Sequence, residues 1–188
     1  MIASRQDYRR YVRADIAAYG LQRVGLIDWF RIDQLRFQLR LRRLEYLTNC
    51  RRWRLLSRLV LEVLNHRLAV RLGFTVPKNV FGPGLCLVHR GTVVVNPAAR
   101  VGANCRLHPS TSIGDYNGTP TLGDNVYIGP GAKLYGDITI GNNVAIGANA
   151  VVNHSFPDNC TVGGVPARVL SSTGALEQGV FPKTLIHG

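Results

Sequence analysis

The chain lacks the long apolar runs and the cysteine patterns that mark membrane-spanning and disulfide-stabilised proteins. No stretch of about 18 apolar residues without a charge occurs, so no transmembrane helix is expected. A signal peptide is not expected either, because Asp7 and four arginines precede any apolar stretch. Cys50, Cys86, Cys105 and Cys160 lie far apart and form no CxxC or Cys/His pattern, which predicts neither a disulfide framework nor a zinc site. We therefore expect a soluble, cytoplasmic protein with free thiols and no metal.

Proline is absent from residues 5–72, and the same region carries most of the positive charge. Residues 1–72 hold 16 of the 23 basic residues, all of them arginine, against six acidic ones. Such a block can contact a membrane surface or an anionic polymer, since clustered cations attract polyanions. The alternative is a solvated arginine face on helices that pack elsewhere. No nucleic-acid-binding motif accompanies the charge, so no nucleic-acid partner is expected.

Apolar residues three and four positions apart predict helices before residue 73, with Gly20 and Gly73 as stops. The predicted helices cover residues 5–18, 27–48 and 51–71. The last of them carries one apolar stripe, formed by Trp53, Leu56, Val60, Val63 and Leu64. We expect the apolar faces of these helices to pack on one another or on a partner subunit.

After Gly73 the chain follows a six-residue repeat in which an aliphatic residue is usually followed by glycine. An upstream series is Phe81, Leu87 and Val93, which slips by two residues to Val95. The next series is Val101, Leu107 and Ile113. The longest series is Leu122, Ile128, Leu134, Ile140, Ile146 and Val152.

This spacing predicts a three-sided parallel β-helix. One short strand and one corner form each side of the prism, so every sixth side chain points inward and about 18 residues complete a coil. A helical reading fails because apolar residues six apart do not form one stripe at about 3.6 residues per turn. The predicted organisation is a helical region over residues 1–73, a β-helix over 74–170 and a tail over 171–188.

The repeat is interrupted twice, and both interruptions are candidate binding loops. The interval from Ile113 to Leu122 is nine residues, which predicts that residues 114–119 bulge from the prism. The interval from Val152 to Val162 is ten, which predicts that part of residues 153–159 is ejected. Insertions without function are the alternative for both.

Three segments of the β-helix carry a family resemblance. Residues 84–96 read GLCLVHRGTVVVN, residues 120–133 read PTLGDNVYIGPGAK, and residues 164–168 read GVPAR. Residues 74–170 thereby resemble the hexapeptide-repeat acyltransferases, and within them the serine acetyltransferase branch. The resemblance implies a left-handed β-helix, acetyl-CoA as co-substrate, and His89 as catalytic base. It also implies a homotrimer, which the N-terminal helices could join into a hexamer.

The resemblance and the spacing suggest further site residues. His108 lies about one coil beyond His89 and is a candidate for acceptor binding, together with the loop residues Asp115 and Tyr116. A structural role is the alternative for both histidines. Candidates for CoA binding are small residues that let the pantetheine arm approach and cations that can pair with phosphates. These candidates are Gly129, Gly131, Ala132, Lys133, Ala148 and Arg168.

The chemistry expected of His89 follows from the pKa of a hydroxyl, which is too high for unaided attack on a thioester at neutral pH. An imidazole, with a reference pKa of about 6.5, is largely neutral at pH 7 and can accept that proton. The tautomer could be held by a backbone carbonyl, without a partner carboxylate.

Four departures from the serine acetyltransferase pattern leave the acceptor open. Val88 replaces an aspartate before the histidine, a second aspartate would fall near Phe74, and Gly118 and Thr119 replace an arginine and a histidine. The acceptor is either serine or a similar hydroxy amino acid, or else a sugar or capsule-type polysaccharide. A zinc enzyme of the γ-carbonic-anhydrase type would need an HxxxxH pair, which is absent. A catalytically silent scaffold would release no free CoA.

Overall fold

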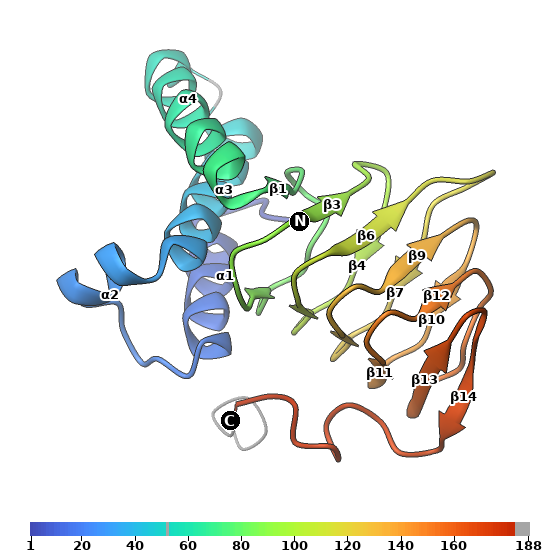
Figure 1. The fold of residues 1–188 in the computed structure, drawn as a ribbon. Helices are drawn as coiled ribbons and strands as arrows, with labels where there is room; N and C mark the ends of the chain where they lie inside the picture. Colours follow the sequence, from blue (N-terminus) through green and yellow to red (C-terminus); the bar gives the residue numbers. More distant parts are fainter. Residues whose placement is uncertain (52, 183–188) are drawn as a thin grey trace.

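A computed structural model describes residues 1–51 and 53–182. In this part of the chain, four helices gather at one end, and the strands coil away from them as a stack (Figure 1). The last six residues of the predicted tail lie outside the described residues, as does Arg52 of the third predicted helix. Among the described residues, no helix is long and apolar enough to cross a membrane.

The helices are α1 (Arg5–Ala18), α2 (Leu26–Arg31), α3 (Asp33–Cys50) and α4 (Leu55–Leu72). The predicted single helix over 27–48 is wrong, because Ile32 adopts φ −106° and ψ 79° and separates α2 from α3. This break starts α3 at Asp33, whose buried carboxylate pairs with Arg90 of the β-helix at 2.6 Å. Gly20 and Gly73 both follow helix ends with positive φ, as predicted.

The strands form the three faces of a prism. The first sheet contains β1 (Phe74–Thr75), β3 (Val93–Val95), β6 (Thr111–Gly114), β9 (Lys133–Tyr135) and β12 (Val151–Val152). The second contains β4 (Arg100–Val101), β7 (Thr121–Leu122) and β10 (Thr139–Ile140). The third contains β2 (Cys86–Leu87), β5 (Arg106–Leu107), β8 (Tyr127–Ile128), β11 (Val144–Ile146), β13 (Cys160–Gly164) and β14 (Ala167–Ser171). All pairs are parallel except β13 with β14, so the predicted β-helix is confirmed.

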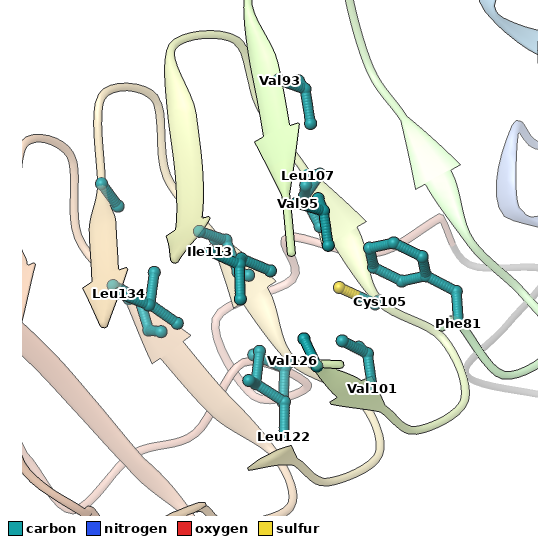
Figure 2. Close-up of a cluster of buried hydrophobic side chains, with 14 of the residues drawn as sticks. Phe81, Val93, Val95, Val101, Cys105, Leu107, Ile113, Leu122, Val126 and Leu134 are labelled. Carbon is teal, nitrogen blue, oxygen red and sulfur yellow. The ribbon is translucent and has the colours of Figure 1, made fainter. Parts of the chain in front are cut away.

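The core is the column of side chains that the six-residue repeat predicts. From Phe81 to Val152, each predicted interior residue is at most 6% exposed. Figure 2 shows these side chains converging inside the coil, with Val93 and Val95 both directed inward where the register slips. Burial of this continuous aliphatic column is the main contribution to the stability of the β-helix.

The two interruptions of the repeat have different structures. Ile113 pairs with Leu134, 21 positions later, whereas Ile128 pairs with Ile146, 18 positions later. Three extra residues therefore bulge after β6, as predicted. The second predicted bulge is wrong: Ile146 pairs with Val162, only 16 positions later. Phe156 bridges to Ile140 and is buried, so ten residues span two sides of the prism and nothing is ejected.

A buried cluster of charges joins the helices to the first coil. Arg42 donates to the carboxylates of Asp15 (2.7 Å) and Glu45 (3.1 Å), and all three side chains are almost fully buried. Burial lowers the pKa of Arg42, because it disfavours the charged guanidinium. The carboxylates of Asp15 and Glu45 raise this pKa by more, so it lies above the ordinary value for arginine.

Side chains of α1 and α3 also bind the main chain of the first coil. Arg42 donates to the carbonyls of Phe81 and Gly82, and Asp15 accepts from the amides of Gly84 and Leu85. Further along the same coil, Gln38 donates to the carbonyl of Leu85 and Tyr19 to that of Leu87. The first coil is thus held against the helices by polar contacts along most of its third-sheet side.

Candidate active site

The predicted site residues centre on one corner of the prism, where the chain passes from the third sheet to the first. We call this edge the histidine corner. In successive coils it is formed by residues 88–92, 108–110, 129–132 and 147–150. Main-chain hydrogen bonds stack these segments: the amide of Val88 donates to the carbonyl of Leu107, and that of His108 to Ile128. Side chains one coil apart are therefore neighbours.

His89 and His108 lie next to each other on this corner. Their ring centroids are 6.2 Å apart, and the ring centroid of His108 lies 5.0 Å from that of Tyr127. His89 is exposed, while His108 is partly buried. The fold thus places an accessible imidazole beside a sheltered one.

His108 carries a ring nitrogen with no partner. Within the described ranges, its Nε2 is buried and makes no hydrogen bond. Burial lowers the pKa of His108, and the charges of Arg106 and His89 lower it further. His108 is therefore a neutral imidazole at pH 7, and its Nε2 keeps an unused capacity for one hydrogen bond beside the histidine corner.

The segment that carries His89 is held by residues that sequence reasoning missed. Arg90 pairs with Asp33 at 2.6 Å, and the hydroxyl of Tyr19 donates to the carbonyl of Leu87 at 2.9 Å. These contacts join residues 57 and 68 positions apart. No local pattern signals them, because each depends on how α1 and α3 dock on the first coil.

Four of the six candidate CoA residues lie on the histidine corner below the two imidazoles: Gly129, Gly131, Ala132 and Ala148. A Cβ on Gly129 would come within 2.8 Å of the main chain of the next coil, so stacking alone requires glycine there. Ala132 is completely buried in the core, so this residue offers no surface to a ligand. Ala148 is exposed.

The two candidate cations lie beside this corner. Lys133 is exposed on β9, and its Nζ donates to the carbonyl of Ser110 on the histidine corner. Arg168 is exposed on β14, at the far end of the third sheet. Lys133 is thus close to the strip of small residues, while Arg168 lies at the end of the stack.

Asp115 and Tyr116 lie at a different corner, between β6 of the first sheet and β7 of the second. Both are exposed, and Tyr116 stands against Tyr135 at 6.4 Å. A single chain therefore does not bring this loop to His89. Its side chains are free to meet a neighbouring molecule.

The thiols near the site are poor nucleophiles. Cys86 precedes the His89 segment, and burial raises the pKa of its thiol to about 11. Burial also raises the pKa of the Cys105 thiol. Among the described residues, no group of three or more histidine, cysteine or acidic side chains is arranged to hold a metal ion.

Comparison with known proteins connects this geometry to a family. Residues 119–154 match the family model described as bacterial transferase hexapeptide (six repeats). The chain is 36% identical over 119 residues to a serine acetyltransferase from Synechococcus elongatus, covering 60% of this chain and 49% of that protein. A serine acetyltransferase from Staphylococcus xylosus is 34% identical over 124 residues, covering 63% and 56%. The chain thus spans about half the length of these relatives.

The similarity to solved structures includes the N-terminal helices as well as the β-helix. A serine acetyltransferase from Brucella abortus in complex with coenzyme A superposes with a TM-score of 0.72 at 27% identity, over 90% of this chain and 70% of that one. A soybean serine acetyltransferase complexed with serine gives a TM-score of 0.70 at 25% identity, over 88% and 70%. Both matches include residues on either side of Gly73, because neither the helical nor the β-helical part alone makes up 88% of the chain.

Proposed function

Since this chain belongs to the hexapeptide-repeat acyltransferase family and is similar to its serine acetyltransferase branch, we propose that it transfers the acetyl group of acetyl-CoA to a hydroxyl oxygen. The observation that carries the proposal is the exposed imidazole of His89 beside the unpartnered Nε2 of His108. Two imidazoles on one corner supply a base and a hydrogen-bonding group for one small polar molecule.

His89 is the general base in this proposal. Its imidazole accepts the proton of the acceptor hydroxyl as the oxygen attacks the thioester carbonyl. The carbon–sulfur bond then breaks, and the imidazolium donates the proton to the departing CoA thiolate. The products are an O-acetyl ester and free CoA. Direct attack is favoured over an acetylated cysteine because the pKa of the nearby Cys86 thiol is raised to about 11.

Acetyl-CoA would lie along the histidine corner, with its thioester near His89. Gly131 and Ala148 leave the main chain of this edge approachable, and Lys133 offers a cation for phosphate. Because the corner is an open edge in one chain, a second prism would close the channel. We place Asp115 and Tyr116 in contact with the acceptor in a neighbouring subunit's site, within a homotrimer.

Serine is the acceptor that the similar proteins favour, because every one of the curated relatives named above is a serine acetyltransferase. The experiment is a free-thiol assay with acetyl-CoA and a panel of serine, homoserine and sugars. We expect CoA release with serine above the acceptor-free rate. CoA release with a sugar but not with serine would assign a saccharide as the acceptor. No CoA release with any acceptor of the panel would overturn the transferase assignment.

Substitution of His108 is expected to weaken acceptor binding more than turnover. Loss of one hydrogen bond to a bound hydroxyl corresponds to about a tenfold rise in acceptor KM for His108→Ala. Because the pKa of His108 is lowered, the rise of the wild-type acceptor KM on acidification should begin at a lower pH than it would for an ordinary histidine. Initial-rate kinetics at several pH values measure both effects. An unchanged acceptor KM in His108→Ala would contradict the role.

A further inference from the structure

One face of α4 is apolar and has no partner among the residues that the structure describes. Leu68 and Leu72 face the β-helix and are buried. The opposite face carries seven large apolar side chains that are each at least 43% exposed. They are Leu55, Leu56, Leu59, Val60, Val63, Leu64 and Val70. An apolar face of this extent marks an interaction surface, since a solvated helix would carry polar residues there.

A pocket rich in arginine adjoins this face. It has a volume of about 370 Å³, and five arginines surround two tyrosines and a leucine. Its lining residues are Arg5, Tyr8, Arg9, Arg43, Tyr46, Leu47, Arg51 and Arg54. Leu47, Arg43 and Arg54 also line the groove along α4 that contains Leu56, Val60 and Leu64. The basic pocket and the apolar groove are therefore one continuous surface.

Within residues 1–51 and 53–182, no acidic side chain neutralises the charge of this pocket. Its lining contains no acidic side chain. The ion pairs among the described residues use Arg10, Arg36, Arg42, Lys78 and Arg90 instead. Arg43 lies over the stacked rings of Tyr8 and Tyr46, at 5.7 and 5.6 Å, which holds its guanidinium at the pocket. Unpaired guanidinium groups in such a concave site favour a phosphate-type anion.

We propose that the arginine pocket and the exposed face of α4 dock on the surface of an anionic phospholipid bilayer. The pocket would take a phosphate headgroup, and the apolar face would lie among the upper acyl chains. Trp53 is exposed at the start of this face, with Arg54 stacked on its ring at 4.8 Å, as suits a residue at the membrane interface. In Figure 1, α4 extends beyond the first coil, at the end of the molecule away from β13 and β14.

The positive charge of this surface favours an anionic bilayer over a second copy of the chain as its partner. The pocket is lined by five arginines and by no acidic side chain, so two such surfaces placed face to face would repel each other. An anionic bilayer attracts them and also accepts the apolar side chains between them. Basic and apolar groups together are the requirement for binding in the plane of a membrane.

The test is flotation of the full-length protein with vesicles of phosphatidylcholine, alone or mixed with phosphatidylglycerol. We expect binding to the mixed vesicles only, weakening as salt rises. The variant Arg54→Gln/Leu56→Gln should bind about fiftyfold more weakly, combining about fivefold for the arginine and about tenfold for the leucine. Both residues are exposed, so the variant keeps the packing of the core.

The matched control is Arg100→Gln/Leu170→Gln, which makes the same chemical change at exposed positions on the β-helix. Control binding equal to wild type, with loss in the α4 variant, supports the proposal. Equal binding to neutral vesicles, or equal loss in both variants, overturns it. So does complete displacement from vesicles by millimolar inorganic phosphate, which would assign the pocket to a free anion. Sedimentation that detects an oligomer lost only in the α4 variant would assign the face to a second copy.

Discussion

Replacement of His89 with alanine is expected to lower kcat/KM for O-acetyl transfer about a hundredfold or more. A positioned general base contributes about a hundredfold to ten-thousandfold to such a reaction. His89 is exposed on the histidine corner, and its segment is anchored by Arg90 to Asp33 and by Leu87 to Tyr19. Removal of the imidazole therefore leaves the fold and the surrounding surface intact while the hydroxyl proton loses its acceptor. The measurement is CoA release over a range of acceptor concentrations.

The control for this experiment is His66→Ala, the same change at an exposed position of α4 that is not part of the histidine corner. Its kinetics should equal those of the wild type. Circular dichroism of His89→Ala should match the wild type, which separates lost chemistry from lost structure. Full turnover by a folded His89→Ala protein would remove this residue from the mechanism.

Replacement of Arg42 with alanine should destabilise the protein by roughly 3–5 kcal/mol, because removal of one partner from a buried ion cluster leaves uncompensated charge. Asp15 and Glu45 would remain buried as carboxylates without their counter-ion. The carbonyls of Phe81 and Gly82 would lose their donor as well. Urea denaturation measures the loss as a lower transition midpoint.

An exposed ion pair provides the comparison. Arg10 pairs with Asp7 at 3.5 Å, and its side chain is 65% exposed. Arg10→Ala should change the free energy of unfolding by no more than about 1 kcal/mol. Equal effects of the two substitutions would mean that the buried cluster contributes no more than a solvated pair.

The β-helix was predictable because one physical requirement repeats along the chain. Each coil must place an aliphatic side chain inward at every sixth position, and Ile128, Leu134 and Ile140 meet that requirement without interruption. The predicted bulge at residues 153–159 was wrong because the ten-residue interval from Val152 to Val162 allows two interpretations. It can be one side of the prism with extra residues, or two sides with fewer than six residues in one of them. The burial of Phe156 decides for two sides. Its aromatic side chain fills an interior place that the aliphatic pattern does not include.

The placement of the candidate site residues was predictable where it depends on the stacking of coils. His89 belongs to a recognisable segment, and the spacing of one coil correctly brought His108 beside it. Asp33, Tyr19 and Arg42 were missed because their partners are remote in sequence and belong to helix docking. The break at Ile32 was missed for a different reason, because the apolar spacing continues through it. Contacts between the two parts of the chain have no periodic signal.

The side chains that cover the first coil also bear on self-association. A parallel β-helix exposes unpaired amides and carbonyls at each end of its stack, and such an edge can template further strands into a fibre. Here Arg42, Gln38 and Tyr19 occupy carbonyls of the first coil, and Asp15 occupies two of its amides. An incoming strand would have to displace these groups before it could add. The helices thus block strand addition along the third-sheet side of this end.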